Sequence, residues 1–107
     1  MKVCEIHFLQ EAMDDLEEIV LYIAQDSRAA AIRMHEKIIG KVGDLATFPN
    51  RGRLIPDKKM SAAGYRVLGI KPYVVFYRVI DNNLFIYRIL HGATNYPLLY
   101  EKLAHGD

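Results

Sequence analysis

The residues best suited to chemistry in this sequence are basic and aromatic side chains between positions 66 and 100. They are Arg66, Arg78, Arg88 and His91, with Tyr77, Tyr87, Tyr96 and Tyr100 nearby in the sequence. A guanidinium group binds a phosphate through two parallel hydrogen bonds, an aromatic ring stacks on a base, and a histidine exchanges protons near neutral pH. Together they fit an RNA-cleaving site that needs no metal ion.

Plainer interpretations of the same residues stay open. The arginines also fit a solvated rim, and a structural role for His91 is at least as good an interpretation as a catalytic one. Regular alternation along a strand would point Arg88 and His91 to opposite faces, so we expect that they do not line one groove.

The elements that must position these residues are three runs rich in β-branched and aromatic side chains, which suit a pleated sheet. Turn residues separate the runs, namely Lys71-Pro72 and Asp81-Asn82-Asn83. Proline cannot donate to a strand ladder, and Asp and Asn tolerate the left-handed backbone of a tight hairpin. The pattern predicts a three-stranded antiparallel meander over residues 65–70, 73–80 and 84–91.

The middle run is largely apolar on both faces. Alternation places Tyr73, Val75, Tyr77 and Val79 on one face, and Val74, Phe76, Arg78 and Ile80 on the other. A sheet that is apolar on both faces should be covered on both. We expect helices on one face. A partner molecule, or the chain's own segment from Tyr96 to Leu103, is expected on the other.

The segment before the meander has the periodicity of two helices, over residues 10–25 and about 28–47, with Asp26-Ser27 as the break and cap between them. Their short connection predicts an antiparallel hairpin. It should pack on one face of the sheet through Leu16, Ile19, Ile23, Met34, Ile38 and Leu45.

A short strand at 2–9 precedes the helices, and a loop from Phe48 to Gly64 follows them. The sequence therefore predicts one α+β domain over residues 1–107, in the order β-α-α-β-β-β, with the hairpin on one face of the meander.

Several kinds of chemistry have no support in the sequence. No glycine-rich phosphate loop follows a strand, no nucleophile elbow surrounds a serine, and the four histidines lack metal-ligand spacing. The carboxylates Asp14-Asp15 and Glu17-Glu18 are interpreted as a solvated helix face. We expect no metal, no cofactor and no membrane span, and the single cysteine, Cys4, favours the reducing cytoplasm.

Charge is unevenly distributed although the net charge is only +1. Residues 1–48 hold five basic and nine acidic side chains, whereas residues 49–88 hold eight basic and two acidic ones. A half this basic indicates an anionic partner, either nucleic acid or an acidic protein.

The pattern as a whole resembles the RelE/ParE superfamily of bacterial toxins from type II toxin–antitoxin systems. The resemblance spans nearly the whole chain. Each matching motif is short, but the order and spacing of the motifs together are specific. The residues that carry it are Asp15-Leu16-Glu17-Glu18-Ile19, Tyr22-Ile23-Ala24, Leu45, Phe48-Pro49, Gly52-Arg53, Tyr65-Arg66-Val67-Leu68, Tyr73-Val74-Val75-Phe76-Tyr77-Arg78-Val79 and Ile89-Leu90-His91-Gly92.

The resemblance implies one of two activities. RelE-like and YoeB-like members cut messenger RNA on the ribosome with basic groups on the sheet and a C-terminal tyrosine or histidine, whereas ParE-like members lack that site and poison DNA gyrase. By this resemblance the catalytic candidates are Arg66, Arg78, His91 and Tyr100, if the protein is a nuclease. The candidates for target or antitoxin binding are Arg51, Arg53, Arg66, Arg78 and Arg88.

Departures from the nuclease pattern favour the gyrase activity. Val74 stands where both nuclease types carry a strand arginine, and Leu68 and Thr94 replace a further lysine and arginine of RelE-like members. Ala93-Thr94 departs from ParE-like sequences too, and Arg78, on the same side as Val74, is a partial substitute. We expect growth inhibition and plasmid stabilisation through gyrase, with ribosome-dependent mRNA cleavage as the alternative and an inactive or purely protein-binding family member as a third interpretation. A cognate antitoxin is expected in an apolar groove on the sheet.

Overall fold

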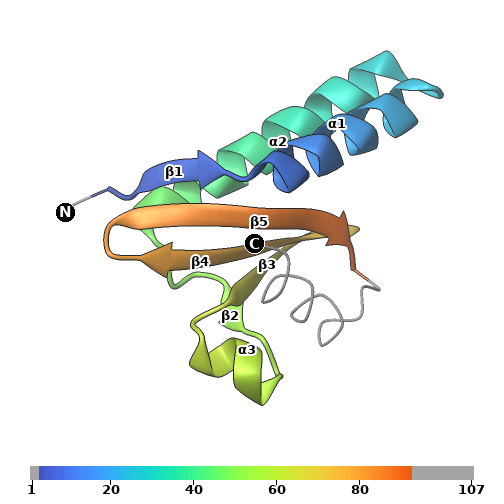
Figure 1. Cartoon of the computed structure of the whole chain (residues 1–107). Coiled ribbons are helices and arrows are strands. Elements are labelled where there is room, and N and C mark those ends of the chain that lie inside the picture. Colours follow the sequence, from blue (N-terminus) through green and yellow to red (C-terminus); the bar gives the residue numbers. More distant parts are fainter. Residues whose placement is uncertain (1–2, 93–107) are drawn as a thin grey trace.

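The chain folds into two helices, a five-stranded sheet and a further short helix. The computed structural model describes residues 3–92 (Figure 1). The elements, in order, are β1 (Glu5–Phe8), α1 (Gln10–Ala24), α2 (Arg28–Thr47), β2 (Arg53–Leu54), α3 (Lys58–Ala62), β3 (Arg66–Ile70), β4 (Tyr73–Ile80) and β5 (Asn83–His91).

The predicted meander is present as three antiparallel strands within a larger sheet. The strand order is β1-β5-β4-β3-β2, in which β1 runs parallel to β5 and forms one edge. The hairpin between β4 and β5 turns on Asp81, whose φ of 57° is the left-handed conformation that the Asp-Asn-Asn sequence predicted. The α+β class and the meander are therefore confirmed.

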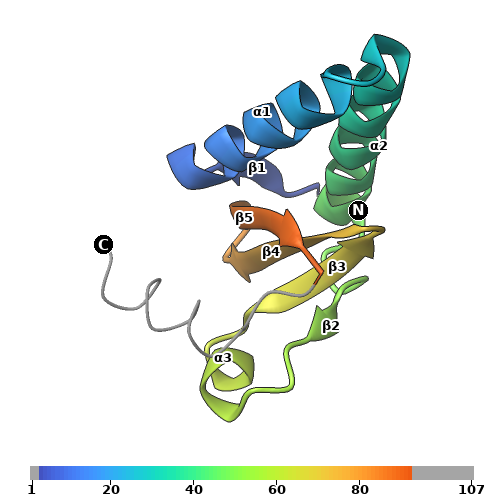
Figure 2. The same cartoon turned by 90° about the vertical axis from the view of Figure 1, so that its right-hand side faces the viewer.

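The two long helices begin and end close to their predicted limits. Ser27 caps α2, because its Oγ accepts a hydrogen bond from the backbone N–H of Ala30 at 3.1 Å. Both helices lie on the same side of the sheet (Figure 2). Their apolar residues meet Val75, Tyr77, Leu84 and Ile86 in one core, the first-face cluster. Of the six helix residues expected in this core, only Ile23 is not part of it.

The loop predicted over residues 48–64 is wrong in one respect, because it contains β2 and α3. Asp57 caps α3 by accepting a hydrogen bond from the N–H of Met60 at 3.0 Å. The α3 helix lies on the side of the sheet away from the long helices (Figure 2). Its Met60 is fully buried there, in one cluster with Val74 and Phe76. The order is thus β-α-α-β-α-β-β-β rather than β-α-α-β-β-β.

The second face of the sheet carries a core of its own, the second-face cluster. Its buried residues are Ile55, Met60, Tyr65, Val67, Val74, Phe76 and Tyr87. The expectation of an apolar groove for an antitoxin on this face is wrong, because the segment from Ile55 to Tyr65 already packs there. The alternative cover, Tyr96 to Leu103, lies outside the described residues.

Candidate functional site

Arg78 lies on the second face among aromatic rings. Its guanidinium carbon is 4.5 Å from the ring centre of Tyr65 and 5.5 Å from that of Tyr87. It donates to the Tyr87 hydroxyl at 2.9 Å and to the Ala63 carbonyl at 3.4 Å. Its buried Nε has no hydrogen-bond partner among residues 3–92. Arg78 lies on the same face of the sheet as Val74, as the sequence predicted. Its guanidinium group, however, is bound to the residues at the C-terminal end of α3 and to the two tyrosine rings.

Arg66 lies on the opposite face. It pairs with Tyr77 across β3 and β4, so its side chain shares the face of the first-face cluster. Its Nη1 donates to the carbonyl of Gly52 at 2.8 Å. Arg66 therefore braces the 49–54 segment and lies on a different side of the sheet from Arg78.

Tyr77 holds the same 49–54 segment in place through its hydroxyl group. Its buried hydroxyl donates to the Pro49 carbonyl at 2.7 Å and accepts from the Gly52 N–H at 2.9 Å. A Cβ at Gly52 would lie only 2.5 Å from this hydroxyl and 2.8 Å from the Val67 carbonyl, so the site needs glycine. Burial raises the pKa of the Tyr77 phenol, against smaller opposing effects of Gly52 and Arg66.

Arg88 forms a two-pronged ion pair with Asp15 of α1. Its Nε and Nη2 donate to the two carboxylate oxygens at 2.7 and 2.9 Å, and the Ile89 N–H donates to the same carboxylate at 2.9 Å. The hydrogen bond to Asp15 raises the pKa of Arg88 above its ordinary value. The side chain of Asp15 is only 10% exposed, so its assignment to a solvated helix face was wrong.

His91 and Arg88 line one cleft, contrary to the prediction. The cleft lies between α1 and the end of β5, and its lining also includes Glu18, Ile19, Tyr22 and Tyr73. The edge of β5 explains this. Within residues 3–92, β1 pairs with β5 only as far as Ile86, so no strand lies beside the rest of that edge and the Arg88 side chain reaches around it to Asp15 of α1. Side chains at a bare edge can bend around it.

The predicted catalytic residues do not form one constellation within residues 3–92. Arg66 and Arg78 lie on opposite faces, and Arg88 is held by Asp15. Arg66 pairs with Tyr77, while His91 pairs with Tyr73, four residues away along β4. That separation corresponds to about 13 Å along a strand. The fourth candidate, Tyr100, lies outside the described residues.

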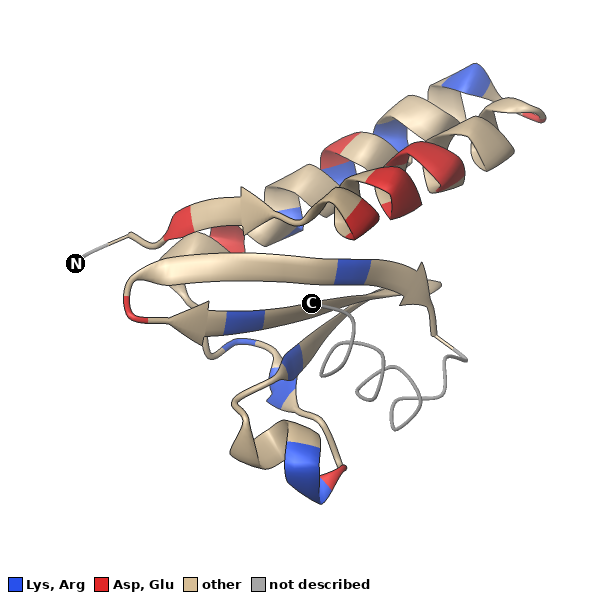
Figure 3. Ribbon diagram, in the orientation of Figure 1, with Lys and Arg blue, Asp and Glu red and all other residues tan. Residues whose placement is uncertain are grey.

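The remaining predicted arginines lie on an exposed basic surface around β2 and α3. Arg51 sits 4.0 Å from Asp44 and over the ring of Phe48, whereas the side chain of Arg53 makes no hydrogen bond or ion pair within residues 3–92. Lys58 and Lys59 of α3 are exposed beside them. Figure 3 shows basic residues over β2, β3, β4 and α3, while acidic residues gather on α1.

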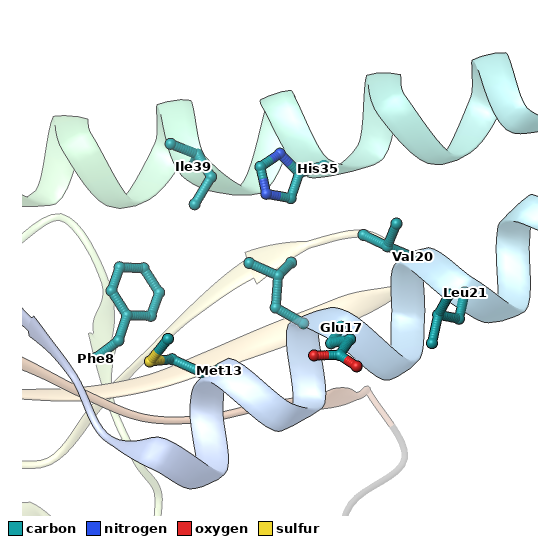
Figure 4. Close-up of a pocket in the computed structure, with 8 residues that line it drawn as sticks. Phe8, Met13, Glu17, Val20, Leu21, His35 and Ile39 are labelled. Atoms are coloured by element: carbon teal, nitrogen blue, oxygen red, sulfur yellow. The ribbon is translucent and has the colours of Figure 1, made fainter.

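A second surface, not found from the sequence, is an apolar groove between α1 and α2. It has a volume of about 450 Å³ and is lined by Phe8, Met13, Leu16, Glu17, Val20, Leu21, His35 and Ile39 (Figure 4). Met13 and Leu21 are more than half exposed, and Ile39 is 41% exposed. The sequence did carry a signal for this groove. Met13, Leu21 and Ile39 are apolar but fall outside the stripe of each helix that faces the core.

Two other kinds of site find no support in the described part of the chain. Within residues 3–92, no three His, Cys, Asp or Glu side chains gather as a metal ion would need. No helix of this part is long and apolar enough to cross a membrane.

The chain is similar to known toxins over most of its length. Residues 6–96 match the family described as the ParE toxin of type II toxin–antitoxin systems, parDE. A curated relative, "Toxin RelE2" of Caulobacter vibrioides, is 34% identical over 91 residues, which are 85% of this chain and 98% of that protein.

Solved structures share the fold. A chain of the chromosomal ParDE system of P. aeruginosa superimposes with a TM-score of 0.67 at 23% identity, over 83% of this chain and 96% of its own. A chain of the RelBE2 toxin–antitoxin complex of Mycobacterium tuberculosis gives a TM-score of 0.56 at 23% identity, over 83% and 98%.

Proposed function

Because this chain belongs to the family of ParE toxins of type II toxin–antitoxin systems, we propose that it arrests bacterial growth by binding DNA gyrase. A cognate antitoxin neutralises it. The observation that supports binding rather than RNA cleavage is that the arginines of the sheet stabilise the fold instead of gathering at one site. Arg66, Arg78 and Arg88 each make hydrogen bonds that hold the fold, and they point to different places.

Cleavage of RNA without a metal requires fixed cations at one point. They must stabilise the negative charge that develops on the phosphate, and one such donor contributes about 3 kcal/mol, or about a hundredfold in rate. Arg66 and Arg78, on opposite faces of the sheet, cannot act on the same phosphate. The geometry of residues 3–92 thus favours a toxin that works by occupying its target.

The surface best suited to that target is the basic one around Arg53. Its charge is exposed and is not used by the fold within residues 3–92, so it is available to an acidic protein surface. Lys58 and Lys59 extend the same surface along α3.

The test compares two charge reversals in the full chain, Arg53→Glu and Lys71→Glu. Both residues are exposed and basic, but Lys71 lies in the turn between β3 and β4, at the other end of β3. We expect the wild type to inhibit supercoiling by purified gyrase and to leave ribosome-bound messages intact. Arg53→Glu should weaken inhibition roughly tenfold or more, and Lys71→Glu should retain it.

Message cleavage with supercoiling untouched would instead establish the nuclease. In that case Arg66→Ala, Arg78→Ala and Tyr100→Phe should each slow cleavage. Equal inhibition by both charge-reversal variants would move the target surface away from Arg53.

The antitoxin is proposed to dock in the groove between α1 and α2. One of the two solved structures is of a ParDE toxin–antitoxin system and the other is of the toxin–antitoxin complex RelBE2. The second face of the sheet is filled, whereas the groove exposes Met13, Leu21 and Ile39 together. Contiguous exposed apolar surface of this kind marks an interaction site, and an amphipathic segment fits a groove between helices.

A further inference from the structure

Two glycines in the interior of α2 have no role within the described fold. Gly40 and Gly43 are both exposed, and a Cβ built on either would meet nothing within 4 Å. Neither has the positive φ that would require glycine, since Gly64 alone among the described glycines has one. The space above both residues is open.

Such glycines weaken the helix that contains them. Glycine in a helix interior loses more backbone entropy on folding than alanine does, so each position lowers the stability of α2. Where neither packing nor backbone conformation calls for glycine, the remaining use is the close approach of another backbone.

The two glycines continue the groove beyond its last lining residue. Residues four apart on a helix share a face, so His35, Ile39 and Gly43 follow one another along the groove side of α2. Ile39 lies nearest Phe8 and Met13 in the close-up, at the end of the groove toward which α2 continues (Figure 4). Gly40, three residues before Gly43, widens this flat end, which we call the glycine seat.

We infer that the antitoxin lays a helix along the groove and brings its backbone against the glycine seat, where any side chain would hold it off. The inference rests on the proposed function, because it names how the partner of that groove is recognised. Helix axes approach most closely where the contact residues are smallest. The helix should therefore pair its bulky residues with Met13, Leu21 and Ile39 and come closest at Gly43.

Charge defines the two sides of that helix. All five charged residues of α1 are acidic, and Glu17 lines the groove, whereas Asp15 and Glu18 line the cleft on the other side of α1. The α2 helix carries four basic and two acidic residues. A helix lying between them is favoured when its basic side chains face α1 and its acidic side chains face α2. The partner is thus an amphipathic helix with one apolar stripe and oppositely charged flanks.

The test separates stability from recognition. The variants are Gly43→Ala, Gly43→Leu and, as a matched control, Ala29→Leu, which adds a side chain to an exposed position near the start of α2. The probe is the protein product of a short reading frame adjoining the gene for this chain, once sequencing of that region has identified one. Gly43→Ala should raise the melting temperature of the free toxin by about 3 to 6 °C. Gly43→Leu should bind the probe roughly tenfold or more weakly, because over-packing a close contact is unfavourable.

Ala29→Leu should bind the probe like the wild type. A further variant, Leu21→Asp, places a charge in the groove and tests the groove itself. If Leu21→Asp loses the probe while Gly43→Leu binds normally, the glycine seat is overturned and the proposed docking groove stands. Normal binding by both variants overturns the seat and the groove together. If the wild type neither arrests growth nor binds the probe, the result contradicts the proposed function itself, independently of the glycine variants.

Discussion

Asp15 shows how a single side chain can replace a missing strand. Among residues 3–92, no strand pairs with the edge of β5 beyond Ile86, and an unpaired backbone N–H is costly when water cannot reach it. Asp15 accepts the Ile89 N–H and two bonds from Arg88. It therefore fastens α1 to the half of β5 that β1 does not cover.

Replacing Asp15 by alanine should lower the free energy of unfolding by about 2–3 kcal/mol, because Arg88 and the Ile89 N–H would lose their acceptor. Chemical denaturation at neutral pH measures the change. Glu17→Ala, at an exposed position on the same helix, is the control and should stay within about 0.5 kcal/mol. Equal effects of the two changes would mean that the ion pair contributes nothing beyond an ordinary surface contact.

Tyr77 has the same role for the segment that leads into β2. Tyr77→Phe removes the acceptor of Gly52 and the donor of Pro49, so the free energy of unfolding should fall by about 2 kcal/mol at pH 7. Tyr22→Phe, at an exposed position on α1, should change it little.

The pH dependence of stability gives Tyr77 a second signature. Burial raises its folded-state pKa above the ordinary value of 10.0, so the unfolded chain loses this proton first as pH rises. The contribution is present below pH 10 and is lost as pH rises from there through the folded pKa. Stability measured between pH 9 and 11 should fall more steeply in the wild type than in Tyr77→Phe. Parallel curves would count against a buried, neutral Tyr77.

At the scale of elements, α3 decides what the second face of the sheet can do. Five residues are too few for a stable helix alone, so its stability comes from the Asp57 cap and from packing. Met60 contributes most directly, since it is fully buried in the second-face cluster. Arg78 fixes the other end of the segment through the Ala63 carbonyl.

Met60→Ala should therefore destabilise the protein by about 3 kcal/mol through lost apolar burial and a residual cavity. Limited proteolysis should then cut first between residues 53 and 65. Met13→Ala is the control, because Met13 is 53% exposed and shortening it leaves no cavity. A Met60→Ala protein as stable and as protease-resistant as this control would show that α3 is not a structural cover.

For the whole molecule, the two proposed binding surfaces lie on opposite sides of the sheet. The groove belongs to the helical side, and the basic surface around Arg53 and α3 lies toward the other side (Figures 1 and 3). A partner that docks in the groove and also shields Arg53 must pass around an edge of the sheet. Opposite charges on the two sides would guide such a partner in one orientation.

The sequence by itself determined the features that depend on local patterns. Alternation and turn residues predicted the meander, helical periodicity and Ser27 predicted the hairpin, and short motifs identified the family. These succeed because neighbouring residues along the chain decide turns, caps and the face to which a side chain points. The Asp57 cap was visible in the same way and was missed only because five residues give too little periodicity.

The tertiary structure decided how those elements combine, and with them the site. Arg66 and Arg78 looked like one basic set, but the register of β3 on β4 places them on opposite faces. The sequence pattern suggested that Asp15 is solvated, but in the fold its carboxylate accepts a hydrogen bond from the Ile89 N–H at the edge of β5. The apolar groove and the glycine seat exist only because α1 and α2 lie side by side. Contacts of this kind join residues far apart in the chain, and no local pattern encodes them.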